Sequence, residues 1–241
     1  MNPILIPAIE LVPPASYAEM DHALSQLDEF DWVLFTSANA VEVFLERSSN
    51  TLGALPRIAA IGPATARALE AAGLHMDLMP RQAVAEAFVE ALLPHIRKLD
   101  GVPSRFLLVR AETAREHLPE KLREAGAEVT IVTSYRTVIP ETSFAAIREI
   151  FGSREMWPDA ITFTSSSTVS NLMALVEGAG LELPEEILRV SIGPVTSRTL
   201  REANFSPHAE AEEPTIPKLV EAVIQMFRLR TCSQNADFFG R

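Results

Sequence analysis

Short apolar runs alternate along this chain with longer segments in which apolar residues recur at helical spacing. The runs at 32–35, 106–109 and 160–163 are rich in β-branched or aromatic residues, and the first and third end at a Thr-Ser pair. Amphipathic segments follow them, so each run is typical of a strand that leads into a helix. Strands alternating with helices predict parallel sheets with helices on both faces, which is an α/β fold.

The chain also resembles itself. Three blocks in the first half match three blocks in the second half in the same order, namely 31–41 with 159–169, 61–69 with 192–200, and 88–92 with 219–223. The offset is 128 for the first block and 131 for the other two, so the copies differ by one small insertion between the first and second blocks. Ordered matches of this kind indicate a domain duplication. We therefore expect an enzyme with two copies of one unit and an active site in the cleft between them.

The boundaries of the two copies follow from the segments that flank them. Residues 7–16 and 134–143 resemble each other and have the composition of extended connectors. We expect a linker strand and a remnant of the second domain at 1–16, a first α/β domain at 17–131, a return linker strand at 132–143, and a second α/β domain at 144–228. Residues 229–241 have no periodicity, which predicts a disordered tail.

Composition narrows the class of function. No apolar run approaches the roughly 18 residues that a membrane span needs, and the start of the chain lacks the features of a secretory signal, so a cytoplasmic protein is expected. The net charge of −11 argues against a nucleic-acid partner. It also means that local donors must hold any anionic substrate. Cys232 is the only cysteine, which excludes a disulfide within the chain.

Common catalytic motifs are missing from the sequence. It has no Gly-rich dinucleotide fingerprint, no phosphate-binding Gly-Lys-Ser loop, no nucleophile elbow and no His-Glu-x-x-His. The histidines, at 22, 75, 95, 117 and 208, are scattered without the spacing of metal ligands. We therefore expect neither a cofactor nor a metal.

Hydroxyl residues remain as candidates, because they stand at matched places in the two copies. They follow the strands or begin the helices, and they are Thr36, Ser37, Thr65, Thr164, Ser165, Ser166, Ser167 and Thr196. Ligands of open parallel sheets bind outside the carboxyl ends of the strands, where helix N-termini present free N–H groups that suit carboxylates. Simple capping of the helices is the alternative interpretation. Tyr135, in the connector between the copies, could donate a hydrogen bond to a leaving oxygen or could simply be packing.

The chain resembles the uroporphyrinogen-III synthase family along nearly its whole length. The similarity depends on the order and spacing of several motifs: Phe35-Thr36-Ser37-Ala38-Asn39-Ala40-Val41, the two Ile-Gly-Pro-x-Thr blocks at 61–65 and 192–196, the Arg115 to Gly126 segment, Val132-x-x-Tyr135-Arg136-Thr137-Val138, and Pro214-Thr215. The resemblance implies two flavodoxin-like domains joined by a two-stranded linker. It also implies an enzyme of tetrapyrrole (heme) biosynthesis that uses no cofactor.

The resemblance implies a reaction as well. Linear hydroxymethylbilane, a polycarboxylate, closes to uroporphyrinogen III with loss of water and inversion of ring D, through an azafulvene and a spiro-pyrrolenine. Tyr135 corresponds to the tyrosine that assists departure of the hydroxyl, and Thr65 and Thr196 to threonines that face the cleft. The donors to the substrate carboxylates would be Thr36, Ser37, Asn39, Thr164, Ser165, Ser166 and Thr215.

The start of the chain departs from the family pattern, because the opening strand and first helix of the family are not found there. We therefore expect the second domain to lack one strand and one helix and to expose apolar surface. Further expectations are a monomer, no membrane partner and a transient contact with hydroxymethylbilane synthase. A non-catalytic two-domain protein that binds or senses a small carboxylate is the alternative function.

Overall fold

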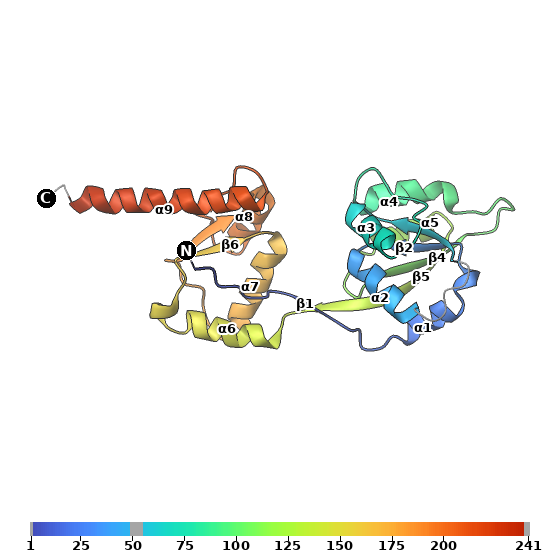
Figure 1. Ribbon diagram of the computed structural model, residues 1–241, viewed down its shortest axis with the longest axis horizontal. Helices are drawn as coiled ribbons and strands as arrows, with labels where there is room; N and C mark the ends of the chain where they lie inside the picture. The colour runs from blue at the N-terminus through green and yellow to red at the C-terminus, as the bar shows by residue number, and fades with distance from the viewer. Residues whose placement is uncertain (1, 49–54, 239–241) are drawn as a thin grey trace. The chain divides into compact units, whose positions relative to one another are not determined.

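The computed structural model describes the backbone of residues 2–48 and 55–238 and the side chains as far as Leu229 (Figure 1). The chain divides into two compact units. We call Leu11–Val138 the first unit, and Met1–Glu10 together with Ile139–Arg241 the second unit. Each contains its own sheet and its own core.

The first unit has a five-stranded sheet of order β1-β5-β4-β2-β3. Its strands are β1 (Glu10–Val12), β2 (Trp32–Phe35), β3 (Arg57–Ala60), β4 (Arg105–Ala111) and β5 (Glu128–Val138). The pairs β2–β3, β2–β4 and β4–β5 are parallel. A parallel bridge between Ala59 and Leu78 continues the sheet beyond β3.

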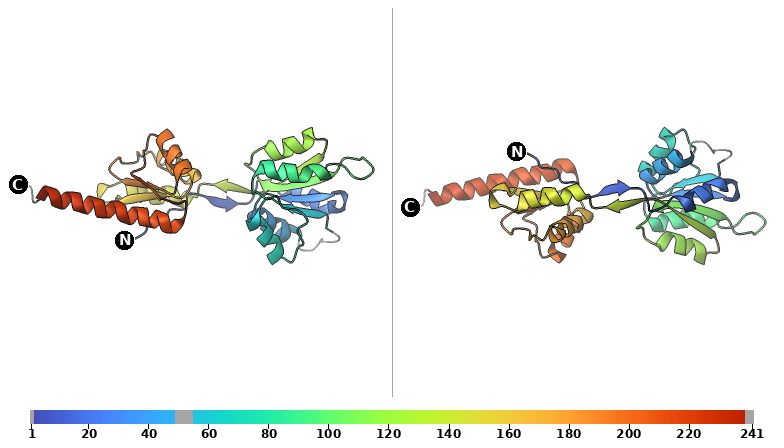
Figure 2. Two further views of the ribbon diagram at one scale, coloured as in Figure 1. Left: turned by 90° about the horizontal axis from the view of Figure 1, so that it is seen from above. Right: turned by 90° about the horizontal axis from the view of Figure 1, so that it is seen from below.

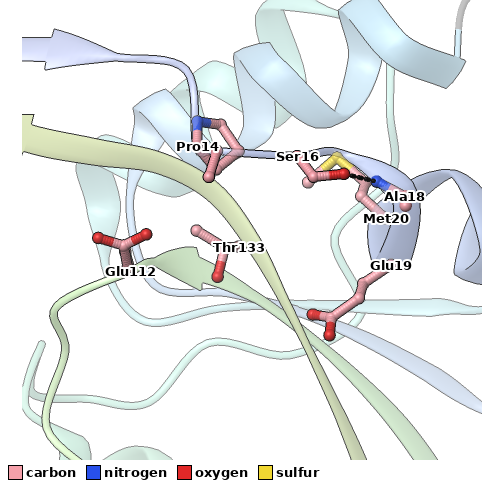
Figure 3. A pocket seen from close by; sticks show the side chains of 8 residues that line it. Pro14, Ser16, Ala18, Glu19, Met20, Glu112 and Thr133 are labelled. Carbon is pink, nitrogen blue, oxygen red and sulfur yellow. Dashed lines mark hydrogen bonds between the residues drawn. The ribbon is translucent and has the colours of Figure 1, made fainter.

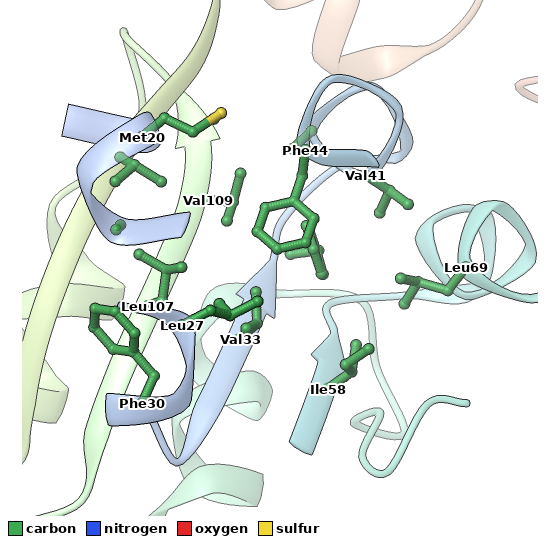
Figure 4. Close-up of a cluster of buried hydrophobic side chains, with 14 of the residues drawn as sticks. Met20, Leu27, Phe30, Val33, Val41, Phe44, Ile58, Leu69, Leu107 and Val109 are labelled. Atoms are coloured by element: carbon green, nitrogen blue, oxygen red, sulfur yellow. The ribbon is translucent and has the colours of Figure 1, made fainter. Parts of the chain in front are cut away.

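Helices cover both faces of this sheet, as Figure 2 shows. On one face lie α1 (Ala18–Ser25), α2 (Ala38–Ser48) and α3 (Pro63–Ala71), and on the other α4 (Ala85–Leu92) and α5 (His117–Glu124); short 3-10 helices span Leu27–Glu29 and Leu93–His95. Val33 and Phe35 of β2 pack under the first group of helices (Figure 4). Trp32 and Leu34 pack under the second group. Because alternate residues of β2 enter opposite cores, the strand is apolar throughout.

The second unit has a three-stranded parallel sheet of order β6-β7-β8, formed by β6 (Ala160–Phe163), β7 (Leu188–Ser191) and β8 (Ala209–Glu210). Its helices are α6 (Glu141–Phe151), α7 (Ser166–Gly178), α8 (Pro194–Glu202) and α9 (Ile216–Phe238), with a 3-10 helix at Arg154–Met156. Residues of α6, α7 and α8 form one core cluster. Residues of α9 pack on the other face, against Val190.

The predicted α/β fold with parallel sheets is confirmed, and so are the strands at 32–35, 106–109 and 160–163. Helix α5 ends at Glu124, and Gly126 follows directly after its C-cap, Ala125. Gly126 has φ 98°. A left-handed residue after a helix is most easily a glycine, because a Cβ would be strained there.

The segment boundaries differ from the prediction at two places. β5 continues to Val138, and Val132 and Thr133 pair with β4, so these residues belong to the sheet and not to a connector. The tail was expected to be disordered from residue 229, but α9 continues to Phe238. Neither glycine nor proline occurs between Lys218 and Phe238 to end the helix. Residues 239–241 lie outside the described residues.

In the second unit, β6 is an edge strand, whereas its duplicate β2 is paired on both sides. Among the described residues, nothing in the second unit corresponds to the β4–α5–β5 segment of the first. The exposed apolar side chains of the second unit include Ile4, Leu5 and Ile9. The sheet of the second unit is therefore smaller than that of the first unit, and the expectation that a strand and a helix of the family are missing from it stays a prediction.

Candidate active site

The hydroxyl residues of the first unit lie at the carboxyl end of β2 and in the first turns of the next helices. Thr36 and Ser37 follow β2 directly, and the Ser37 Oγ accepts a hydrogen bond from the Ala40 N–H at 3.1 Å. Asn39 lies half-buried in the first turn of α2. Thr65 lies in the first turn of α3 and is only 3% exposed. Ser37 therefore caps its helix, while Thr65 packs into the unit.

Tyr135 contacts this set of residues. Its hydroxyl donates a hydrogen bond to the Ser37 Oγ at 3.1 Å, although the two residues are 98 positions apart in sequence. The Tyr135 ring is partly buried against the cluster that contains Val33 and Phe35. The structure thus joins the predicted catalytic residue to a predicted substrate-binding residue.

A β-bulge explains how Tyr135 reaches Ser37. Arg110 pairs with Thr133 and Ala111 pairs with Tyr135, so Ser134 is the extra residue. The buried Ser134 hydroxyl donates to the Arg110 carbonyl at 3.0 Å. Because of the bulge, Val132 and Tyr135 pack on the same cluster although they are three residues apart, which regular alternation would not allow. Ser134, a small polar residue in an alternating strand, is not among the residues that the sequence pattern indicated.

A pocket of about 320 Å³ lies at the carboxyl ends of β2, β3 and β4. We call it the Arg110 pocket, and its lining residues are Thr36, Ile61, Ala83, Val84, Ala85, Glu86, Leu108, Arg110, Ala114, Arg115 and Leu118. Arg110 is 8% exposed; its guanidinium donates to the Arg115 carbonyl at 3.2 Å and forms an ion pair with Glu116. The sequence analysis did not consider Arg110, although an arginine that ends an apolar strand is a signal for a buried charge.

Close approach of two loops shapes one wall of this pocket. A Cβ placed on Gly62, directly after Ile61, would lie 2.6 Å from the Ala83 Cβ. Real Cβ contacts are longer, so only glycine allows the loop before α4 to pack on the turn after β3. Gly62 therefore helps to place the N-terminus of α4 at the pocket.

A second pocket of the first unit, about 390 Å³ in volume, has the opposite electrostatic character (Figure 3). Its lining includes the carboxylates of Glu19 and Glu112, together with Thr133 and the Pro14–Met20 segment. Among the described residues that line it, none is an arginine or a lysine. The Arg110 pocket is the better candidate for binding a carboxylate, because two acidic side chains repel an anion.

The second unit carries the duplicated hydroxyl set, and two of its members, Ser165 and Thr215, cap helices. Thr164 is exposed after β6, and the Ser165 side chain and Thr168 form a capping box at the start of α7. The Ser166 Oγ accepts from the Thr199 Oγ1 of α8 at 2.9 Å. Thr196 is buried in the first turn of α8, and the Thr215 Oγ1 accepts from the Lys218 N–H at 3.4 Å at the start of α9.

The two units thus place the predicted residues in two sets, each at the carboxyl ends of its own strands. Thr65 and Thr196 are both 3% exposed. Each lies two residues behind the proline that begins its helix, on the side that packs against the sheet. The expectation that both sets face one cleft stays a prediction.

No group of three His, Cys, Asp or Glu side chains that could hold a metal ion occurs among the described residues. In the same part of the chain, no helix is both long enough and apolar enough to cross a membrane.

Comparison with known proteins gives a consistent result. The family model described as "Uroporphyrinogen-III synthase HemD" matches residues 1–221. The uroporphyrinogen-III synthase of Synechococcus elongatus is 33% identical over 241 residues, with 95% of this chain and 87% of that protein covered. A putative uroporphyrinogen-III synthase of Methanothermobacter thermautotrophicus is also 33% identical, with 91% and 87% covered.

Solved structures of similar fold carry the same description. A mutant uroporphyrinogen III synthase from Thermus thermophilus has a TM-score of 0.57 at 21% identity and covers 94% of this chain and 89% of that one. The Helicobacter pylori uroporphyrinogen-III synthetase has a TM-score of 0.58 at 18% identity, with 90% of each chain covered. At these identities the structural match supports the fold.

Proposed function

The chain belongs to the uroporphyrinogen-III synthase family, and from this premise we propose that it is a lyase that closes hydroxymethylbilane to uroporphyrinogen III. Water is lost and ring D is inverted in this reaction. The observation that carries the proposal is the hydrogen bond from Tyr135 to Ser37 at the carboxyl end of β2. It puts a phenol and a hydroxyl where open parallel sheets bind their ligands.

Tyr135 is the proposed acid of the first step. The phenol O–H gives its proton to the ring A hydroxyl as the C–O bond breaks, so that the hydroxyl leaves as water. The remaining azafulvene is electrophilic, and the substituted carbon of ring D attacks it to give the spiro-pyrrolenine. That intermediate fragments and closes again with ring D inverted.

Ser37 is well placed to keep Tyr135 in position during this step. In the structure the Tyr135 O–H donates to the Ser37 Oγ. When the phenol turns its proton towards the leaving oxygen, the Ser37 hydroxyl can rotate and donate to the phenol oxygen in return, because a hydroxyl is both donor and acceptor. This would stabilise negative charge on the phenol oxygen as it gives up its proton.

The hydroxyl residues of both units are proposed to hold the substrate carboxylates. Side-chain or backbone donors would come from Thr36, Ser37, Asn39, Thr164, Ser165, Ser166 and Thr215. Thr65 and Thr196 are too buried to reach a ligand directly, so we propose that they act by placing the first turns of α3 and α8. Helix N-termini suit this task, since their free N–H groups attract anions. The net charge of −11 makes such local donors necessary.

The oligomeric state, the location and the partners of the protein are proposals as well. We propose a monomer in the cytoplasm that takes its polycarboxylate substrate from hydroxymethylbilane synthase through a transient contact, without nucleic acid or membrane. The charge balance supports the part that concerns nucleic acid, because a basic face would be needed for it.

The function is tested by the products that the full chain forms from hydroxymethylbilane. After oxidation, chromatography separates the porphyrins of isomers I and III. An active enzyme gives mainly isomer III. A protein that only binds or senses carboxylates leaves the spontaneous product, isomer I, unchanged, and this result would reject the proposed function.

A further inference from the structure

We propose that the Arg110 pocket binds one carboxylate group of the substrate and that Arg110 pairs with this carboxylate. The identity of the ligand rests on the proposed function, whereas the pocket and its charge are features of the first unit alone. Arg110 was not among the candidate residues that the sequence indicated, and no hydroxyl of the duplicated set supplies a positive charge.

The position of the Arg110 pocket in the sheet favours ligand binding. β2 connects through α2 to β3 on one side, and β4 connects through α5 to β5 on the other side. The strand order therefore reverses between β2 and β4. Open α/β sheets bind ligands outside the carboxyl ends of the strands at such a reversal. Thr36 at the end of β2 and Arg110 in β4 line the pocket at this point.

The burial of Arg110 indicates what kind of ligand the pocket binds. An arginine that is 8% exposed is stabilised by an anion, because a guanidinium keeps its charge in a protein. In the free chain Glu116 provides this anion, but the Glu116 side chain is 51% exposed. An ion pair with one solvent-exposed partner is replaceable at little cost. A substrate carboxylate that enters the pocket can therefore take the place of Glu116.

The charged and apolar side chains that line the pocket suit a carboxylate on a short methylene chain. Arg110 and Arg115 line the pocket with one acidic residue, Glu86, so the positive charges outnumber the negative ones once Glu116 has given up its place beside Arg110. On a chain with a net charge of −11, such a local excess of positive charge is a place where an anion is stable. The apolar side chains of Ile61 and Leu108 suit the methylene carbons of a propionate or acetate group.

The start of α4 adds backbone donors to this pocket. Within the part of the chain that the structure describes, no side chain caps α4 at Val84, and the residues at its start, Val84, Ala85 and Glu86, line the pocket. At the duplicated position of the second unit, Thr215 accepts from the Lys218 N–H and so caps α9. The first N–H groups of α4 thus remain available for an anion beside Arg110.

The test compares three variants in steady-state formation of isomer III. Arg110→Gln removes the charge and is expected to raise KM for hydroxymethylbilane about tenfold or more, with kcat changed less than about twofold, because a uniform binding contact is lost. Arg110→Lys should recover part of the affinity. Glu116→Gln removes the competing carboxylate and should lower KM.

The opposite signs of the KM changes in Arg110→Gln and Glu116→Gln distinguish a role in substrate binding from a role in stability alone. If the Arg110–Glu116 pair served only stability, both neutral variants would raise the unfolded fraction and neither would lower KM. Arg189→Gln, at the other nearly fully buried arginine in the second unit, is the matched control and should leave KM unchanged. An unchanged KM in Arg110→Gln, or a raised KM in Glu116→Gln, would overturn the proposal.

Failure of this proposal can be distinguished from failure of the proposed function. If the wild-type chain forms isomer III and Arg110→Gln keeps its KM, only the pocket assignment is wrong. If the wild-type chain forms no isomer III, binding of uroporphyrin III, the oxidised polycarboxylate, is measured by fluorescence titration instead. Weaker binding by Arg110→Gln and tighter binding by Glu116→Gln would then support the pocket independently of catalysis, and equal affinities would reject it.

Discussion

Strands β2 and β6 are duplicates in sequence, but their surroundings differ. All four residues of β2 are buried, whereas in β6 only Phe163 is buried and Thr162 is exposed. β2 is paired with β3 on one side and β4 on the other, while β6 is paired with β7 alone. The difference arises from the β4–α5–β5 segment, which flanks β2 and has no counterpart among the described residues of the second unit.

The same segment carries the proposed acid, Tyr135, and the proposed carboxylate-binding residue, Arg110, which have no counterpart among the described residues of the second unit. Arg110 ends the buried part of β4, Ser134 forms the bulge in β5, and Tyr135 follows it. The β4–α5–β5 segment thus completes the cover of the sheet and also supplies a phenol and a buried charge. The two copies share hydroxyl residues that cap helices, but only the first unit has the phenol and the buried guanidinium of the proposed site.

The largest expected effect concerns the centre of β2. Leu34 is 0% exposed, and its duplicate in β6 is Thr162, which is exposed. Leu34→Ala should lower the free energy of unfolding of the first unit by about 2 to 5 kcal/mol, because it leaves a cavity between β2 and two helices. Thr162→Ala should change the second unit by less than about 0.5 kcal/mol. Urea unfolding of both variants measures these values, and similar losses would contradict the difference in burial.

The next effect concerns Tyr135, which has no duplicate. Tyr135→Phe keeps the ring in the core but removes the hydroxyl that donates to Ser37. Formation of isomer III should fall about 100-fold, the low end of what a positioned acid contributes. The rate is measured with saturating hydroxymethylbilane. A loss of less than roughly threefold would remove Tyr135 from the mechanism, since that is far below the effect of a general acid.

A smaller effect is expected at Arg189, whose place in the first unit is taken by Ile58. Burial lowers the pKa of the Arg189 guanidinium, and its Nη1 has no hydrogen-bond partner among the described residues. Arg189→Met should therefore raise the free energy of unfolding of the second unit by about 1 kcal/mol. Denaturant unfolding tests this, and a clear loss of stability would show that the bond from Arg189 to the Ser206 carbonyl outweighs the unpaired donor.

The smallest effect is a pH dependence of the first unit. Burial against Trp32, with a further contribution from Arg57, lowers the pKa of His95 below its ordinary value of 6.5. Below pH 6.5 the unfolded chain takes up a proton more readily than the folded unit, so stability falls as the pH decreases through this range. His95→Gln should remove this part of the slope. Thermal unfolding measured between about pH 5 and 8, the range in which histidine titrates, gives the pH dependence of stability in both proteins.

The local elements could be predicted from sequence, because their signals lie within a few neighbouring residues. The strands at 32–35 and 160–163 are apolar runs that stop at Thr-Ser, and their duplication showed that both units share one design. The contact of Tyr135 with Ser37 could not be predicted from spacing, because a bulge at Ser134 decides the direction of the side chain. Arg110 was missed for a similar reason, since only the packed structure shows that its charge is buried.

The most direct test compares the duplicated serines Ser37 and Ser165. Each accepts a backbone hydrogen bond at the start of a helix, so Ser37→Ala and Ser165→Ala should cost similar stability, about 1 kcal/mol. Only Ser37 also contacts Tyr135. We predict that Ser37→Ala lowers kcat for isomer III about tenfold, the equivalent of one lost hydrogen bond, and Ser165→Ala less than about twofold. Equal losses of kcat would contradict the account that the first unit holds the reacting groups.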